Sequence, residues 1–164
     1  YFDMWLAIQM SNMGLSVFTS SPHEDQEQKT VGKKVSRIKT GSILVLDDDF
    51  DINNMLKMSL QKHGYSVFGF TDPLLALEHF RINHSTYSLV ISDLRMPSMS
   101  GFQFIQNIKH IRPKINVLLM SAFDVIGDSE FSTHSSKYEI DGFLQKPISI
   151  KKLNSIIKSY MMKN

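Results

Sequence analysis

The sequence contains no cysteine among its 164 residues. A disulfide framework, a thiolate zinc site, an iron–sulfur cluster and a cysteine nucleophile are therefore excluded. A long hydrophobic run is also missing, because Asp3, Gln9 and Asn12 interrupt the apolar stretch at residues 1–18, whereas a membrane span needs roughly 20 consecutive apolar residues. We expect no membrane span. The sequence also lacks the basic start and the cleavage site of a secretory signal, so we expect a cytoplasmic protein.

Neither sign of charge is in large excess. The chain has 18 Lys and Arg residues against 16 Asp and Glu residues, which gives a net charge of +2. Direct binding of nucleic acid usually needs a broad basic surface, so we do not expect it here.

Residues 20–42 differ in composition from the rest of the chain. They hold three acidic residues, then five basic residues, and almost nothing apolar, which is typical of a linker. We therefore divide the chain into an N-terminal extension and linker at residues 1–41, poorly defined, and one domain at residues 42–164. The apolar residues Trp5, Leu6 and Ile8 are consistent either with a short amphipathic helix or with a partly ordered tail.

From residue 42 onward, short apolar runs alternate with longer segments of helical periodicity. This alternation is typical of βα repeats around a parallel sheet. The five runs that we predict to be strands are residues 43–46, 65–70, 88–91, 115–120 and 142–144.

The segments between these runs carry helix signals. Asp72 and Pro73 are typical of an N-cap and a first helical residue, and Gly64 of the left-handed residue that ends a helix. A fourth helix is expected within residues 124–138, but its Ser-rich sequence disfavours a regular one. The apolar positions that we expect to face the core are Ile52, Met55, Leu56 and Leu60; Leu74, Leu77 and Phe80; Phe104, Ile105 and Ile108; and Leu153, Ile156, Ile157 and Tyr160.

Polar side chains follow four of the five predicted strands. In an open doubly wound sheet these positions share one edge, where ligands bind. A single Asp at such a position could equally be an ordinary helix cap rather than part of a site. Three carboxylates brought together would repel one another unless a cation lay between them, and oxygen ligands without Cys or paired His favour Mg²⁺ over zinc. The residues are Asp47, Asp48 and Asp49, then Asp93, then Ser121, then Lys146 with Pro147.

This set of side chains is suited to phosphoryl transfer. A carboxylate beside Mg²⁺ and Lys146 is a plausible nucleophile toward phosphorus, because both cations neutralise charge on the transferring oxygens. Asp93 would then become an aspartyl phosphate. The Ser121 hydroxyl would hydrogen-bond a phosphoryl oxygen and report its presence to the neighbouring helix.

The motifs ILVLDDDFD, VISDLRMPSMSG, LLMSAF and GFLQKPI resemble those of the receiver domain of two-component response regulators. The resemblance covers residue 42 to about residue 163. It implies a flavodoxin-like α/β fold, in which a doubly wound parallel sheet of five strands in the order 2-1-3-4-5 carries helices on both faces. The chain resembles the single-domain, chemotaxis-regulator-like members of the family.

The resemblance also implies a role for each matching residue. Mg²⁺ would be the cofactor, and a histidine kinase or a histidine phosphotransfer protein would be the phosphodonor. A downstream protein would bind the face of the fourth helix, fifth strand and fifth helix, and the chain would catalyse only its own phosphorylation and dephosphorylation. The implied residues are Asp47 and Asp48 with Asp93 and the main-chain carbonyl of Arg95 for the metal, Asp93 as phosphoacceptor, Lys146 on the phosphoryl group, and Ser121 and Phe143 as the switch pair.

In receiver domains the residues two beyond the acceptor and two beyond the switch hydroxyl flank the path of the attacking water. They are Arg95 and Phe123 here. Both are bulky and neither orients a water, so we expect a comparatively long-lived aspartyl phosphate.

Two other functions remain as alternatives. Asp49, Asp51 and Asn53 form a DxDxN run that is similar to the motif of haloacid dehalogenase-type phosphohydrolases, although a GDxxxD-like string from Gly127 fails at Ser132. The second alternative is a pseudo-receiver, a binding module that is not phosphorylated.

Overall fold

The computed structural model describes residues 41–122, 133 and 136–161. Every predicted strand is confirmed, and each end lies within two residues of its expected position. The elements in chain order are β1 (Ser42–Leu46), α2 (Phe50–Lys62), β2 (Ser66–Phe70), α3 (Pro73–Asn83), a 3₁₀ turn (His84–Thr86), β3 (Tyr87–Asp93), α4 (Gly101–Ile111), β4 (Asn116–Ser121), β5 (Gly142–Gln145) and α6 (Ile150–Met161).

The strands form one parallel sheet in the order β2-β1-β3-β4-β5. The flavodoxin-like order 2-1-3-4-5 is therefore confirmed. Strands β1, β3 and β4 are buried along nearly their whole length, which explains why they read as continuous apolar runs rather than alternating ones. Because all five strands run in the same direction, their carboxyl ends lie at one edge of the sheet.

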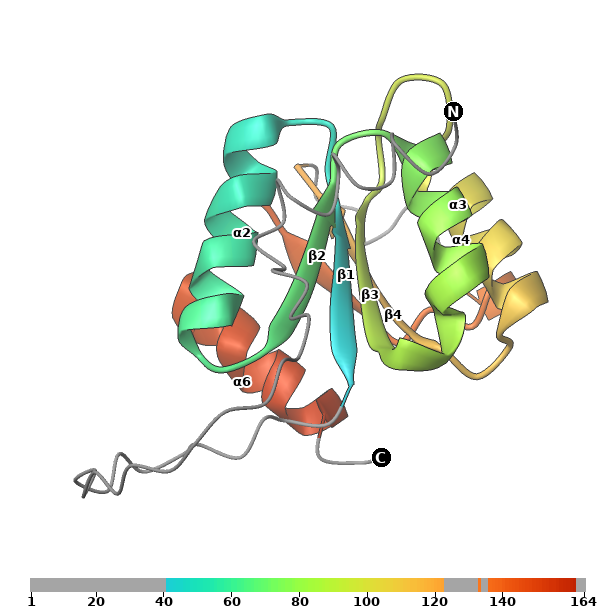
Figure 1. The fold of residues 1–164 in the computed structure, drawn as a ribbon. Helices are drawn as coiled ribbons and strands as arrows, with labels where there is room; N and C mark the ends of the chain where they lie inside the picture. The colour runs from blue at the N-terminus through green and yellow to red at the C-terminus, as the bar shows by residue number, and fades with distance from the viewer. Residues whose placement is uncertain (1–40, 123–132, 134–135, 162–164) are drawn as a thin grey trace, which may run out of the picture. The chain divides into compact units, whose positions relative to one another are not determined.

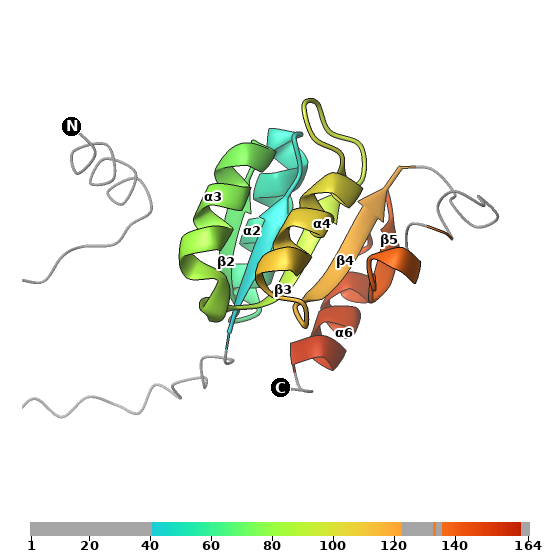
Figure 2. The ribbon, with the colours of Figure 1, turned by 90° about the vertical axis from the view of Figure 1, so that its right-hand side faces the viewer.

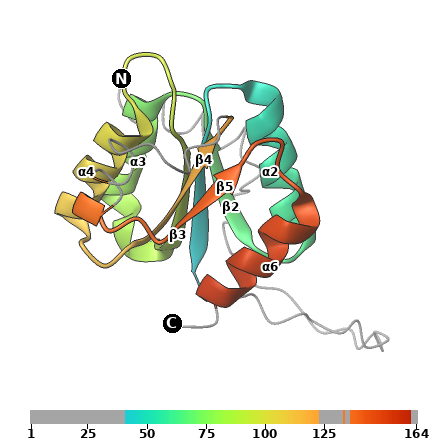
Figure 3. The same ribbon diagram turned by 180° about the vertical axis from the view of Figure 1, so that it is seen from behind.

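Helices cover both faces of the sheet. Helices α2 and α6 lie on one face and helices α3 and α4 on the other (Figures 1 and 3). The side view shows α3 and α4 next to each other in front of the sheet (Figure 2). Each face has its own apolar core, with Leu56, Leu60, Leu153 and Ile157 on one side and Phe80, Phe104, Ile105 and Ile108 on the other.

Helix caps fix where the helices begin. The Asp72 carboxylate accepts the N–H groups of Leu74 and Leu75 at 2.7 and 3.2 Å, so the predicted N-cap is confirmed. Gly64 has φ of +85°, as a left-handed residue after α2 requires. Asp49 caps α2 in the same way, and its carboxylate accepts the N–H groups of Asp51 and Ile52. The caps therefore tie α2 directly to the acidic end of β1.

Two predicted core positions are wrong. Met55 is 43% exposed and Leu74 is 55% exposed. In α2 the buried positions are Asn53, Leu56 and Leu60. Positions three and four apart share a helix face, so Met55, one residue before Leu56, lies off that face. In α3 the buried positions are Pro73, Ala76, Leu77 and Phe80. Leu74 follows Pro73 directly and so lies about 100° around the helix from the centre of that buried face.

Some predictions fall beyond the described residues. The fourth helix expected within residues 124–138 lies mostly outside them, although Thr133, Ser136 and Lys137 are helical. The boundary between residues 41 and 42 stays a prediction, because residues 1–40 are not described. In the described part of the chain, no helix is both long and apolar enough to cross a membrane.

Candidate functional site

A depression of about 270 Å³ lies at the carboxyl edge of the sheet. Its lining comes from the ends of β1, β3 and β4 and from the segment after β5, so the structure brings together side chains that the sequence places up to a hundred positions apart. Ser121, buried at the end of β4, is part of this lining. The charged residues of the lining are Asp47, Asp48, Asp49, Asp93, Arg95 and Lys146.

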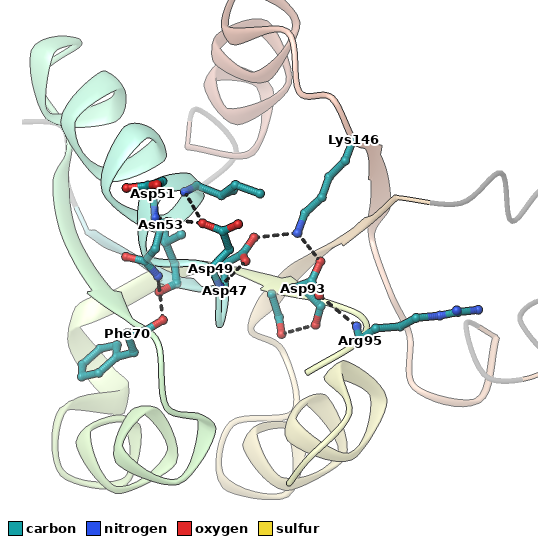
Figure 4. A network of polar contacts seen from close by, with 11 residues as sticks. Asp47, Asp49, Asp51, Asn53, Phe70, Asp93, Arg95 and Lys146 are labelled. Carbon is teal, nitrogen blue, oxygen red and sulfur yellow. Dashed lines mark hydrogen bonds and ion pairs between the residues drawn. The ribbon is translucent and has the colours of Figure 1, made fainter. Parts of the chain in front are cut away.

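Lys146 joins two buried carboxylates. Its Nζ lies 2.8 Å from Oδ2 of Asp47 and 2.6 Å from Oδ1 of Asp93. The side chains of Asp47 and Asp93 are only 1% and 7% exposed, and that of Lys146 is 16% exposed. Figure 4 shows the lysine reaching from the segment after β5 toward the ends of β1 and β3. The ammonium supplies one positive charge to two carboxylates. It therefore relieves part of the repulsion between them, a role that the sequence led us to expect of a metal ion alone.

The second oxygen of each carboxylate accepts a main-chain N–H from two residues further along. Oδ1 of Asp47 accepts the N–H of Asp49 at 3.0 Å, and Oδ2 of Asp93 accepts the N–H of Arg95 at 3.0 Å (Figure 4). Each carboxylate is thus held between its own loop and Lys146. Such bonds fix the orientation of both groups before any ligand arrives.

Burial and the ion pairs shift the pKa values of Asp47 and Lys146. Burial raises the pKa of Asp47 above its ordinary value, although the bond to Lys146 works in the opposite direction. Burial also disfavours the charged Lys146, but its bonds to Asp47 and Asp93 outweigh that and raise the pKa of the ammonium. Lys146 is therefore fully charged at neutral pH. A further cation beside Asp47 would favour the charged form of its carboxylate, which burial disfavours.

Main-chain hydrogen bonds hold the strand ends in register around the cluster. The N–H of Lys146 donates to the carbonyl of Ser121 at 2.7 Å, and the N–H of Leu94 donates to the carbonyl of Met120 at 2.9 Å. At Gly101 an added Cβ would lie 2.3 Å from the carbonyl oxygen of Asp93. The absence of a side chain there lets α4 begin directly against the end of β3.

The remaining residues predicted for the site lie around the cluster. Asp48 and Arg95 are exposed, and the Arg95 side chain extends away from the two ion pairs (Figure 4). Phe143 is half-buried and packs against the core under α3 and α4. Phe123, predicted to flank the path of water, lies outside the described residues.

The lining fits a divalent cation in charge and in ligand type. Four carboxylates against Lys146 and Arg95 leave it with a net charge of −2. Within the described residues, the buried Oδ2 of Asp47 has no partner besides Lys146. In that same part of the chain, no three acidic or imidazole side chains are close enough to form a ready-made cation site. Oxygen donors of this kind suit Mg²⁺, which binds through one or two carboxylates and keeps several waters.

The DxDxN run has structural contacts in this fold. The Asp49 carboxylate caps α2, and the Asn53 amide donates to the carbonyls of Val45 and Phe70. Sequence reasoning had placed Asn53 only in the phosphohydrolase alternative. The spacing of Asn53 from Leu56 and Leu60 could have indicated this structural role, because it places a polar residue on the buried face of the helix.

Comparison with known proteins identifies the relatives of this chain. The sequence model of the response regulator receiver domain matches residues 43–158. The chain is 33% identical over 117 residues to the DNA-binding transcriptional regulator NtrC of Bradyrhizobium sp. (strain RP501 Parasponia), a match that covers 71% of this chain and 23% of that protein. It is 27% identical over 119 residues to sporulation initiation phosphotransferase F of Bacillus subtilis, covering 73% of this chain and 92% of that protein.

A solved structure with the same fold is the response regulator receiver domain protein from Clostridium thermocellum. It superposes with a TM-score of 0.67 at 25% identity, over 75% of this chain and 95% of that one. The chain thus spans nearly the whole of the Bacillus phosphotransferase but about a quarter of the length of NtrC.

Proposed function

Because the chain belongs to the response regulator receiver domain family, we propose that Asp93 accepts a phosphoryl group in a Mg²⁺-dependent reaction. The observation that carries this proposal is the buried cluster in which Lys146 contacts both Asp47 and Asp93. A structural ion pair would need only one carboxylate. Two buried carboxylates on one ammonium leave an unbalanced negative charge. Such a charge lowers the stability of the fold, and groups of this kind are found chiefly at functional sites.

The geometry of the cluster supports the following reaction. A carboxylate oxygen of Asp93 forms a bond to phosphorus as the P–N bond of a phosphohistidine breaks, and the electron pair of that bond stays with the imidazole nitrogen. The Lys146 ammonium lies where a phosphoryl oxygen on Asp93 would arrive, so it neutralises the charge that develops there. The main-chain N–H of Arg95 keeps the acceptor carboxylate oriented.

Asp47, Asp48 and the main-chain carbonyl of Arg95 are the groups that we assign to the metal beside Asp93. When bound, Mg²⁺ supplies further neutralisation of the phosphoryl oxygens and a fixed position for the phosphodonor. Asp47 is already oriented for this role by the N–H of Asp49. Asp48 contributes an exposed carboxylate from the same loop.

The phosphorylated state would be read through Ser121 and Phe143. Ser121 lines the depression at the end of β4, and Phe143 lies one strand away, since Leu119 in β4 pairs with Phe143 in β5. A hydroxyl drawn toward the phosphoryl group changes the space next to the aromatic ring, which couples the site to the surface around β5. We therefore propose a phosphorylation-dependent change in the binding of a partner protein there.

The partners follow from the family. A histidine kinase or a histidine phosphotransfer protein is the proposed phosphodonor, and the proposed location is the cytoplasm. The chain resembles a phosphotransferase over nearly the whole length of that relative, which supports a place in a phosphorelay. Uptake of acid-labile phosphate from a small phosphodonor, with Mg²⁺ and with chelator, tests the proposal, since a pseudo-receiver takes up none in either condition.

Asp48→Ala is expected to raise the Mg²⁺ concentration needed for half-maximal phosphorylation by roughly tenfold or more, since even indirect partners of a metal are worth about that much. The free energy of unfolding should stay the same or rise slightly, because one of several like charges is removed. Asp51→Ala is the matched control, because Asp51 is an exposed carboxylate near the same loop but outside the depression. Equal midpoints for Asp48→Ala and the wild type would contradict the metal assignment.

Arg95→Asn combined with Phe123→Ala is expected to speed loss of the phosphate several-fold, with little change in the rate of phosphorylation. In receiver domains these two positions flank the path of the attacking water, so smaller side chains there should open that path and the amide should orient the water. Release of inorganic phosphate from the phosphorylated chain measures this rate, with Arg95→Lys as the control that keeps the bulk. A double variant that releases phosphate no faster than wild type would overturn the expected long lifetime.

A further inference from the structure

Asn53 is a polar side chain on the buried face of α2. It is 5% exposed and shares that face with Leu56 and Leu60, both fully buried. A buried amide without hydrogen bonds destabilises a fold, so its partners indicate what it does. An apolar residue at this position would continue the stripe and pack against the sheet without needing a partner.

The partners of Asn53 are the carboxyl ends of two strands. Its Nδ2 donates to the carbonyl of Phe70, the last residue of β2, at 2.6 Å (Figure 4). It also donates to the carbonyl of Val45 in β1 at 3.3 Å. The carbonyl of Phe70 also accepts the main-chain N–H of Asp47 at 3.1 Å. One carbonyl oxygen therefore binds both the Asn53 amide and the main chain of a proposed metal ligand.

From Asp47 the contacts continue to the start of α2. The N–H of Asp49 donates to the carboxylate of Asp47, and the carboxylate of Asp49 caps the helix that carries Asn53. The acidic loop is thus closed into a ring of hydrogen bonds through Asp47, Asp49, α2, Asn53 and Phe70. Asn53 is the link in this ring that joins the helix back to the sheet.

Gly69 provides the space for this link. A Cβ at Gly69 would lie 2.3 Å from Oδ1 of Asn53 and 3.4 Å from its Cγ. Any larger residue at position 69 would therefore push the Asn53 amide away from the carbonyl of Phe70. The two positions, 16 residues apart in the sequence, fit each other.

We propose that Asn53 is a positioning residue, which holds the Asp47–Asp49 loop in the conformation that binds Mg²⁺. The inference rests on the proposed function, since it concerns the same metal. It assigns to Asn53 no contact with the metal or with the phosphoryl group. Its effect is to limit the movement of the Asp47 main chain, so that the carboxylates of Asp47 and Asp48 do not have to be ordered when the ion binds.

The test measures Mg²⁺ binding directly, by titration calorimetry of the full chain without phosphodonor. Asn53→Ala and Asn53→Leu are expected to weaken binding several-fold, and Asn53→Leu keeps the volume that Asn53→Ala loses. Asn54→Ala is the matched control, because Asn54 is the next residue of the same helix and is exposed. It should bind Mg²⁺ as the wild type does.

Gly69→Ala tests the same link from the other side without changing Asn53. It is expected to weaken Mg²⁺ binding in the wild-type chain but to have little further effect in Asn53→Ala, where nothing remains for the new Cβ to displace. Hydrogen exchange of the Asp47 N–H should become faster in Asn53→Ala and Gly69→Ala, because the shared carbonyl is no longer held.

The possible results separate this inference from the function on which it rests. If Asn53 variants lose stability but bind Mg²⁺ like the wild type, Asn53 is only structural and the positioning role is wrong, while the proposed function stands. Additive effects of Gly69→Ala and Asn53→Ala also overturn it. If the wild type itself binds no Mg²⁺, both the positioning role and the metal-dependent function are wrong.

Discussion

Asp93→Asn is expected to abolish the uptake of acid-labile phosphate from any donor. An amide does not form the acyl phosphate bond, and in the described structure Asp93 is the buried carboxylate at the end of β3 that Lys146 contacts. The fold should persist, because Asn has nearly the volume of Asp and its oxygen accepts the N–H of Arg95 as Oδ2 does now. The measurement is the amount of phosphate bound per chain after incubation with Mg²⁺ and a small phosphodonor.

Asp49→Asn is the control for this experiment. Asp49 also lines the depression, and Asn caps helices about as well as Asp does, so α2 should keep its start. We expect Asp49→Asn to be phosphorylated at nearly the wild-type rate. The opposite pattern, with phosphate lost in Asp49→Asn and kept in Asp93→Asn, would assign the nucleophile to β1 and favour the phosphohydrolase alternative.

Lys146→Met is expected to slow phosphorylation by roughly a hundredfold or more, the usual effect of removing one charged or hydrogen-bonding group from a transition state. It should also lower the free energy of unfolding at neutral pH by about 3 kcal/mol, since it leaves two buried carboxylates without their counter-charge. Rates from the small phosphodonor and denaturant unfolding curves measure the two effects. Lys151→Met, an exposed lysine at the start of α6, is the control and should change neither.

The stability lost in Lys146→Met should depend on pH. Burial already raises the pKa of Asp47 in the wild type, where Lys146 opposes it, and removing the lysine raises that pKa further. A carboxyl whose pKa is higher in the folded than in the unfolded state binds more protons when folded, so the variant gains stability as pH falls. The deficit relative to wild type should therefore shrink from neutral toward acidic pH, and a constant deficit would contradict the role of the ion pairs.

The sequence predicted the sheet and the edge where the site lies because both depend on local patterns. The apolar runs mark strands buried on both faces, and parallel strands place the residues that follow them at one edge. Asp47, Asp93 and Lys146 were therefore predicted together, and the structure brings them into contact. Their contact through the ammonium was not predicted, because the reach of Lys146 depends on how the segment after β5 packs.

The errors have a physical cause as well. Met55 and Leu74 are apolar residues next to the true buried stripes, and hydrophobicity alone does not show which residue of a pair faces the sheet. Asn53 was missed as a core position because its burial depends on the carbonyls of Val45 and Phe70. Phe70 lies 17 residues away, so no local pattern contains that contact.

The location of the phosphate tests the central proposal most directly. The wild-type chain is incubated with a small phosphodonor, with Mg²⁺ or with chelator, and then reduced with borohydride, which converts an aspartyl phosphate to homoserine. Peptide mass spectrometry then identifies the converted residue. We predict conversion at Asp93 alone, and only in the presence of Mg²⁺. Conversion at Asp49 or at another carboxylate, equal conversion with chelator, or no conversion under either condition would contradict the proposal.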